Sequence, residues 1–195
     1  MTDRYYYFAS KDRRLWYSDN RLIEEGVTHT VEPPLNLCNH GLHASRRAID
    51  ALLYAPGPTI CIVELSGEIL HADDKSCATE RTYLDVFDGG DLLSKFARRC
   101  ALDVINLRDA PYLVREYLET GDADLRADAR TAAWDSDWDS DLGSDLLAAW
   151  YAAWETVWSG AWYAAKAAAR DEKMGEYNTL LEQMISDKLK EDRND

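Results

Sequence analysis

Three side chains that could bind a metal ion lie close together in the sequence: Cys38, His40 and His43. Thiolate and imidazole groups are typical zinc ligands. A fourth ligand could come from further along the chain, from Cys61, His71 or Cys77. Zinc sites usually pair two short ligand clusters, however, and this sequence has one. We therefore expect no bound metal or other cofactor, and we interpret Cys38 and His43 as packing residues at a strand-to-helix junction.

The same segment contains the parts of a nucleophilic site. The nucleophile would be Ser45, Cys38 or Cys77, and the base would be His43 or His71. Such a nucleophile needs a neighbouring base to take its proton. No strand-nucleophile-helix turn surrounds a serine here, and the spacing selects no single triad. These residues therefore do not identify a reaction.

Two arginines follow Ser45 at the expected start of a helix. Ser45 is a good N-cap residue, and Arg46 and Arg47 would lie in the first helical turn. Free backbone N–H groups at a helix start attract anions. The sequence thus predicts an anion-binding site, such as a phosphate site, at Arg46 and Arg47. The alternative is an exposed arginine pair that increases solubility.

The C-terminal part of the chain alternates aspartates with tryptophans. Aromatic or leucine residues recur at every fourth position from Trp134 to Trp162. Because four residues exceed one helical turn by about 40°, one continuous helix would spread these rings too widely for a single face. We expect a break near Gly143 and two helices, each needing a partner. The candidate partner-binding residues are Trp134, Trp138, Asp135, Asp137, Asp139, Asp141, Trp150 and Trp154.

Two other interpretations of these aspartates and tryptophans remain open. The aspartates could form a solvated helix face opposite tryptophans that pack internally, or the tryptophans could join two copies of the chain. A calcium loop of the EF-hand type is not indicated, because the glycine and glutamate that such a loop requires are missing.

The first ninety residues predict a small sheet. Aromatic or β-branched runs indicate strands over residues 4–9, 15–17 and 27–31. Apolar residues recur at helical spacing between Ser45 and Pro56, which predicts a helix there. Residues 59–65 are almost wholly apolar, as is typical of a buried strand. A bend at Ser66 and Gly67 precedes a further strand over residues 68–70. This order predicts an α+β fold with a small mixed sheet.

Helical periodicity dominates the remaining sequence. It predicts helices over residues 91–107, 111–121 and 177–190, with Pro111 at the start of the second and Gly121 at its end. We therefore divide the chain into a mixed α/β module (1–90), a helical connection (91–121) and an acidic, Trp-rich helical region (122–195).

Charge is concentrated in the last region. The chain has a net charge of −14; residues 1–121 contain 19 acidic and 14 basic side chains, and residues 122–195 contain 17 and 8. A negative field disfavours direct nucleic-acid binding and favours a partner with a basic surface. The sequence shows no membrane-spanning run and no export signal, and its four cysteines are scattered. We expect a cytoplasmic protein with reduced thiols.

The motif from Leu37 to Ser45 resembles that of a family of uncharacterised phage and bacterial proteins, which share a Gly-Leu/Phe-His-Ala-Ser/Cys core and often an Ala/Trp-rich tail. The resemblance extends over residues 4–88 and includes the segments 51–57, 63–69 and 74–75. It implies a phage or prophage setting. It implies no particular activity.

The order of elements is also similar to that of ADP-ribosyltransferases. That resemblance implies an NAD cleft in which Arg4 lies on the first strand, Ser45 on the second, and Glu80 polarises the nicotinamide ribose. The family has a second acidic residue or Gln two positions before this glutamate, where the present sequence has Ala78.

Two functions are therefore expected from the sequence. The first is a non-enzymatic phage accessory protein of the counter-defence type, which binds a host protein through the acidic, Trp-rich helices. The alternative is an ADP-ribosyltransferase-like module in residues 1–120 that binds NAD or another nucleotide.

Overall fold

The computed structural model describes residues 3–15, 19–105, 110–135 and 173–194. These residues form two compact units: residues 1–89 with 181–195, and residues 90–180. The first unit contains the sheet, the helix α1 (Ala48–Leu53) and the C-terminal part of α7 (Met174–Asp192). The predicted α+β class is confirmed.

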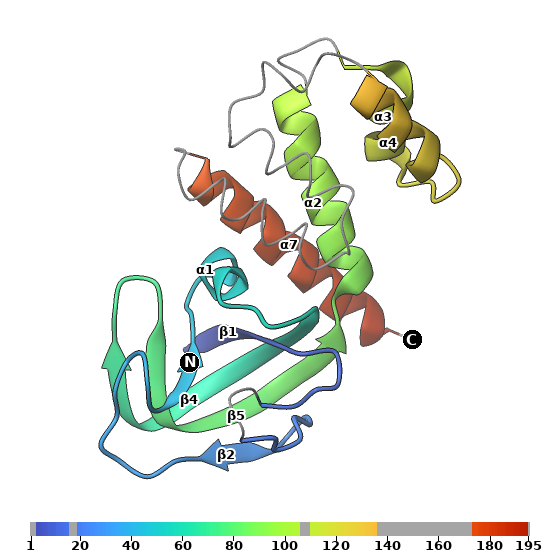
Figure 1. Cartoon of the computed structure of the whole chain (residues 1–195). Helices are drawn as coiled ribbons and strands as arrows, with labels where there is room; N and C mark the ends of the chain where they lie inside the picture. Colours follow the sequence, from blue (N-terminus) through green and yellow to red (C-terminus); the bar gives the residue numbers. More distant parts are fainter. Residues whose placement is uncertain (1–2, 16–18, 106–109, 136–172, 195) are drawn as a thin grey trace. The chain divides into compact units, whose positions relative to one another are not determined.

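Five antiparallel strands make up the sheet of the first unit (Figure 1). The long strands β4 (Thr59–His71) and β5 (Ser76–Asp88) form a central hairpin. The strand β1 (Arg4–Ala9) pairs with β4, whereas β2 (Thr28–Thr30) and β3 (Leu42–Ala44) pair with the other edge of β5. The strand order is β1-β4-β5-β2, with β3 beside β2 on β5.

A backbone bridge closes the strands into a ring. Immediately after β3, the N–H and C=O of Ser45 exchange hydrogen bonds with those of Tyr6 at 2.9 and 2.8 Å. The end of β3 is thereby joined to β1, so that the sheet curls round one interior. Buried side chains fill this interior; they include Tyr5, Ile23, Cys61, Val63 and Tyr83.

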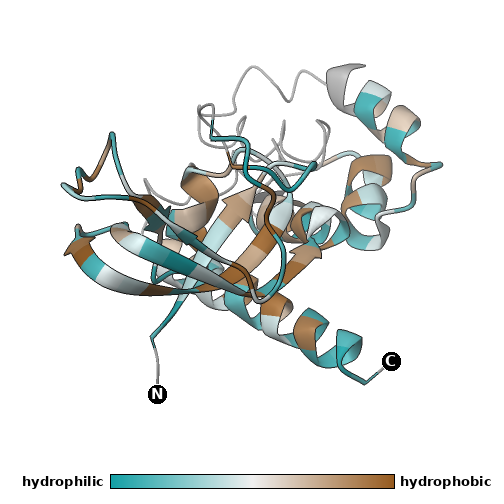
Figure 2. Ribbon diagram, turned by 90° about the horizontal axis from the view of Figure 1, so that it is seen from below, coloured by the Kyte–Doolittle hydropathy of each residue, from teal (hydrophilic) through white to brown (hydrophobic). Residues whose placement is uncertain are grey.

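Helices cover the opposite face of the sheet. In the first unit α1 packs against β1, and α7 contributes the buried Leu181 and Ile185. The carboxylate of Glu182 on α7 accepts a hydrogen bond from the Ala48 N–H at 3.3 Å, and Arg193 forms an ion pair with Asp85 at 3.0 Å. Apolar and polar residues alternate along the strands and around α7 (Figure 2). The C-terminal helix is therefore an integral part of the sheet unit.

The second unit is helical in its described residues. It contains α2 (Gly90–Ile105), α3 (Tyr112–Thr120), α4 (Arg126–Asp135) and the beginning of α7. A core of Ala101, Val114, Tyr117, Leu118 and Ala129 joins the first three helices. Pro111 precedes α3 and Gly121 ends it in a left-handed conformation, as predicted.

The structure differs from the predicted elements around Ser45, at Ser66 and Gly67, and in β5; of the strand predicted over residues 15–17, residues 16 and 17 lie outside the described part of the chain. The helix after Ser45 begins later, with Arg47 at the N-cap and no side-chain cap, because the backbone of Ser45 pairs with β1. Ser66 and Gly67 do not end a strand: β4 continues through them with a register shift. The strand β5 was not predicted. Its inward side chains include a charged one, Arg81, which obscures the apolar alternation.

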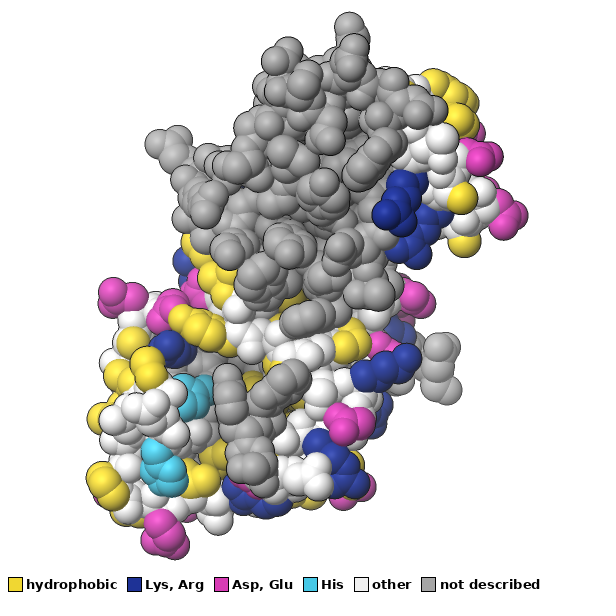
Figure 3. All heavy atoms as spheres, in the orientation of Figure 1, with side chains coloured by type: hydrophobic (Ala, Val, Ile, Leu, Met, Phe, Trp, Pro, Cys, Tyr) yellow, Lys and Arg dark blue, Asp and Glu magenta, His cyan; other side chains and the backbone are white. Residues whose placement is uncertain are grey.

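Within the described residues, none of the helices has both the length and the apolarity needed to cross a membrane. On the face drawn in Figure 3, basic and acidic side chains of the described part lie interspersed.

Candidate functional site

A fully buried arginine occupies the interior of the sheet. Arg81 lies on β5, and only 2 % of its surface is exposed. Its guanidinium carbon lies 3.7 Å from the centroid of the Tyr7 ring and 5.1 Å from that of Tyr83. Nη1 donates to the carbonyl of His43 at 2.5 Å. Nε and Nη2 both donate to the Tyr83 hydroxyl, at 3.1 and 2.7 Å.

No carboxylate forms an ion pair with Arg81 among the described residues. A buried charge normally needs an oppositely charged partner or several hydrogen bonds, since leaving water is costly. Here two aromatic faces, one carbonyl and one hydroxyl take that role. Cation–π contacts are strongest where water is excluded, which is the situation of this guanidinium.

The hydroxyl of Tyr83 connects Arg81 to a buried histidine. The Nδ1 atom of His29 lies 3.1 Å from this hydroxyl, and the two rings meet edge to face with centroids 5.2 Å apart. Because the oxygen already accepts two hydrogen bonds from Arg81, its own hydrogen points to Nδ1. His29 therefore accepts at Nδ1 and is neutral. Its ring also donates to the backbone carbonyl of Leu22.

The surroundings of His29 and Tyr83 explain why both side chains are uncharged. Burial, followed by the positive charges of Arg21 and Arg81, lowers the pKa of His29 below 6.5. Burial raises the pKa of Tyr83 to about 12, against the opposing effect of Arg81. Both groups are therefore uncharged at neutral pH, and Arg81 alone carries charge in this interior network.

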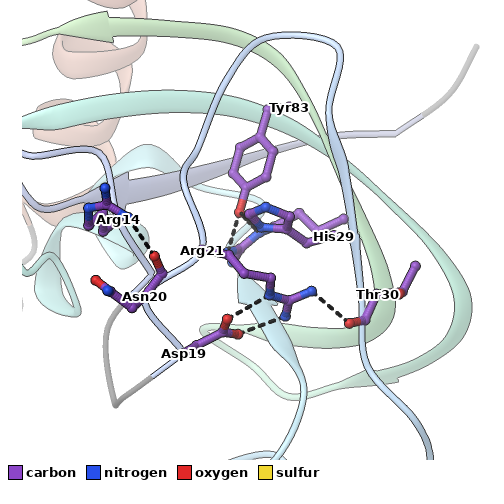
Figure 4. Close-up of polar contacts among 8 residues, drawn as sticks. Arg14, Asp19, Asn20, Arg21, His29, Thr30 and Tyr83 are labelled. Carbon is purple, nitrogen blue, oxygen red and sulfur yellow. Dashed lines mark hydrogen bonds and ion pairs between the residues drawn. The ribbon is translucent and has the colours of Figure 1, made fainter.

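An ion pair lies at the edge of the network (Figure 4). Arg21 donates from Nε and Nη2 to the two carboxylate oxygens of Asp19, at 2.6 and 2.7 Å, and from Nη1 to the carbonyl of Thr30 at 3.0 Å. These bonds lower the pKa of Asp19. Nearby, Arg14 donates to the carbonyl of Asn20 at 2.8 Å, and Asn20 is left-handed, with φ of 53°. Through its bond to Thr30, Arg21 thus attaches the loop before β2 to β2 itself.

The residues proposed for the transferase alternative share one face of the sheet. Arg4 is opposite Glu64 in the register, and Glu80 is opposite Ser66, two residues further along β4. Opposite residues project to the same face, so Arg4 and Glu80 are on one side. The Ser66 hydroxyl donates to Glu80 at 2.7 Å. Among the described residues, Ser45 is buried beside Tyr6 and forms no hydrogen bond or ion pair with Arg4 or Glu80.

The predicted anion site at the start of α1 contains carboxylates of the protein itself. Arg46 forms an exposed ion pair with Asp3 at 3.5 Å, and Arg47 forms one with the buried Asp50 at 3.8 Å. Glu182 accepts from the first helical N–H. Burial, opposed by Arg47, raises the pKa of Asp50. Within the described residues each arginine therefore forms an ion pair with a carboxylate of the protein itself, Arg46 with Asp3 and Arg47 with Asp50.

The Cys38, His40 and His43 segment is held by backbone bonds. The Nε2 atom of His40 lies 2.6 Å from the carbonyl of Glu32, and that of His43 lies 3.1 Å from the carbonyl of Leu37. Cys38 is exposed, contrary to the packing role we expected for it. Among the described residues, no group of three His, Cys, Asp or Glu side chains could hold a metal ion.

Most of the predicted partner-binding residues lie outside the described part of the chain. Trp134 and Asp135 belong to the last turn of α4. The others, Trp138, Asp137, Asp139, Asp141, Trp150 and Trp154, are outside the described residues.

The patterns of the sequence do not single out Arg81, Tyr83 and His29 as a group. The sequence does contain one indication of this group: residues 79, 81 and 83 are every second residue of β5, and such residues lie on one face of a strand. An arginine on that face conceals the pattern. Only the pairing of β2 with β5 brings His29 opposite Arg81.

Residues 17–95 match a family model described as a domain of unknown function (DUF7666). No curated protein matches the chain, and neither does any solved structure. The matched segment includes β2 to β5, α1 and the beginning of α2, and it contains the network of His29, Arg81 and Tyr83. The strand β1 and the helix α7 complete the same unit from outside the matched residues.

Proposed function

We propose that this chain is a non-enzymatic binding protein of phage origin, which acts in the host cytoplasm and contacts a basic surface of a host protein through its acidic, Trp-rich helical region. The observation that carries the proposal is the composition of residues 122–195, with 17 acidic and 8 basic side chains and six of the seven tryptophans. Aromatic side chains are enriched at protein interfaces, and a surface with charges of one sign attracts a partner surface of the opposite sign.

The contacts of the sheet unit agree with a scaffold role for that unit. The polar side chains that could have done chemistry there are engaged inside the protein: Glu80 with Ser66, His43 with Leu37, and Arg47 with Asp50. The anion-binding N–H at Ala48 is engaged by Glu182. A counter-defence role follows from the phage resemblance and belongs to the same proposal.

A charge-neutralising variant tests the proposed surface. Partners are captured from host lysate with the intact chain and identified, and the affinity of each purified partner is measured. Changing Asp135, Asp137, Asp139 and Asp141 to Asn should weaken binding at least about tenfold, because complementary charges at an interface contribute on the order of 1 kcal/mol or more. Added salt should weaken binding by the intact chain in the same direction.

The matched control neutralises four exposed acids of the sheet unit, Glu24, Glu32, Glu68 and Asp73, as Gln or Asn. Both variants have the same net charge, so only the position of the charges differs. Deleting residues 122–195 would be a poor test, because Leu181 and Ile185 belong to the core of the sheet unit. Equal loss of affinity in both variants would show that the aspartates form no specific surface.

The second candidate is a module that binds NAD or another nucleotide. The placement of Arg4 and Glu80 on one sheet face favours it. Calorimetry with NAD and related nucleotides tests it directly, with Glu80→Ala as the variant and Glu68→Ala, an exposed glutamate of the same strand pair, as the control. Absence of binding heat with the intact chain would exclude this candidate.

A further inference from the structure

The hydrogen-bond pattern around His29 accommodates only its neutral form. The Tyr83 oxygen accepts from Nε and Nη2 of Arg81, at 3.1 and 2.7 Å. A phenol oxygen that accepts two hydrogen bonds has no further lone pair to offer. A proton on Nδ1 of His29 would therefore face the Tyr83 oxygen, 3.1 Å away, without an acceptor.

The charges that face His29 oppose a second positive charge. From β5, Arg81 is cationic and Tyr83 is neutral; from the preceding loop, Arg21 is cationic and Asp19 is anionic. Asp19 is the acid among them, and both of its oxygens accept from Arg21. Protonated His29 would therefore add a second positive charge to a buried network in which no described carboxylate pairs with the first, that of Arg81.

His29 also lies in the middle of a segment that is attached to β5 by side chains as well as by backbone bonds: the Val86 N–H donates to the Glu25 carboxylate at 3.0 Å, and the hydroxyls of Thr28 and Thr82 lie 2.7 Å apart. Residues 19–31, which we call the β2 segment, pair with β5 through three strand residues. The flanking backbone bonds run from Gly26 N–H to the Tyr83 carbonyl at 2.8 Å, from Tyr83 N–H to the Val27 carbonyl at 3.0 Å, and from Val31 N–H to the Thr79 carbonyl at 2.8 Å. Asn20, near the start of this segment, is in the left-handed conformation, with φ of 53°.

We propose that protonation of His29 releases the β2 segment from β5, so that mild acid opens this edge of the sheet. The proton enters at Nδ1, the hydrogen bond from the Tyr83 hydroxyl to that atom is lost, and the imidazolium moves to water. Opening exposes the edge of β5 from Thr79 to Tyr83. An unpaired strand edge of this kind can accept a strand from another chain.

The sign of the pH dependence follows from linkage. In the open segment His29 has its ordinary pKa of 6.5, whereas burial and the two arginines lower it in the closed form. The open form therefore binds more protons as the pH falls below 6.5. One linked proton increases the opening constant about tenfold for each pH unit, until the pKa of the closed form is reached.

Hydrogen exchange of the full chain, followed between about pH 7.5 and about pH 5.5 and corrected for intrinsic exchange, tests the proposal. The amides of Gly26, Val31 and Tyr83 should lose protection as the pH falls. Amides of the β1 and β4 pair should keep theirs. Unchanged protection of the β2 segment would overturn the proposal, and so would simultaneous loss in all strands, which is global unfolding.

Two histidine variants test whether protonation of His29, and not of another histidine, opens the β2 segment. His29→Asn keeps an acceptor for the Tyr83 hydroxyl but cannot be protonated, so the pH dependence should disappear. His43→Asn removes another histidine whose pKa is lowered by burial, and should leave the pH dependence of the β2 segment intact. The reverse result would overturn the proposal. If His29→Asn does not fold, the ¹⁵N chemical shifts of the native His29 ring test the proposal instead. A neutral ring with its proton on Nδ1 would contradict the hydrogen bond from the Tyr83 hydroxyl and would overturn the proposal.

Discussion

At the scale of single residues, the unusual feature is the buried Arg81, which forms no ion pair with any carboxylate in the described part of the chain. A carboxylate beside Arg81 would neutralise the charge but would add a second group to be desolvated. The protein instead places the guanidinium on the Tyr7 ring and satisfies it with a hydroxyl and a carbonyl. A planar, delocalised cation suits such a site better than a compact ammonium.

Arg81→Lys should therefore destabilise the protein although the charge is kept. Lysine cannot donate to the Tyr83 hydroxyl from two nitrogens or stack flat on Tyr7, and we expect a loss of about 2–4 kcal/mol in the free energy of unfolding. Urea denaturation measures it as a lower midpoint with an unchanged slope. The control is Arg14→Lys, at an exposed arginine, which should change stability by less than about 0.5 kcal/mol. Equal midpoints for the two variants would contradict this account of Arg81.

At the scale of elements, the C-terminal part of α7 completes the sheet unit. It supplies two buried aliphatic side chains, and its Glu182 accepts from the N–H of Ala48 at the beginning of α1. The short helix α1 has no side-chain cap of its own. A carboxylate at a helix start is favourable, so α7 supplies what the local sequence of α1 lacks.

Leu181→Ala should cost about 2–5 kcal/mol of unfolding free energy, because a fully buried leucine is replaced by a cavity. Thermal or urea unfolding followed by circular dichroism measures the loss. Gln183→Ala, at an exposed position of the same helix, is the matched control and should be nearly neutral. A leucine variant as stable as the control would mean that α7 does not pack on the sheet unit.

At the scale of the whole molecule, the sheet unit is built from two distant parts of the chain. Residues 90–180 lie between them in sequence and form the second unit. A segment inserted in this way is attached at both ends to a folded scaffold. The acidic region that we propose as a partner surface begins within this insertion.

Fragments of the chain test this organisation. Residues 1–89 alone should lack cooperative unfolding, because the apolar surface under Leu181 and Ile185 is left exposed. Joining residues 173–195 to that fragment by a flexible Gly/Ser linker should restore a cooperative transition. The comparison fragment carries the same linker and helix with Leu181 and Ile185 changed to Ser. Cooperative unfolding of residues 1–89 alone would contradict the two-part unit.

The sequence by itself determined the α+β class and most of the element positions. These features depend on short stretches of sequence. The aromatic run of β1, the apolar β-branched run of β4, and the boundaries of α3 at Pro111 and Gly121 each involve only a few neighbouring residues. The helix α7 was predicted from its spacing alone. Its place in the sheet unit was not, because that depends on contacts across more than ninety residues.

Only the tertiary structure revealed the network of His29, Arg81 and Tyr83. His29 and Arg81 are 52 positions apart and become neighbours because β2 pairs with β5 in one register. A charged residue on an inward face also contradicts the pattern from which a strand is predicted. The same long-range pairing places Ser45 beside β1 instead of at a helix cap, since a backbone bridge there closes the ring of strands.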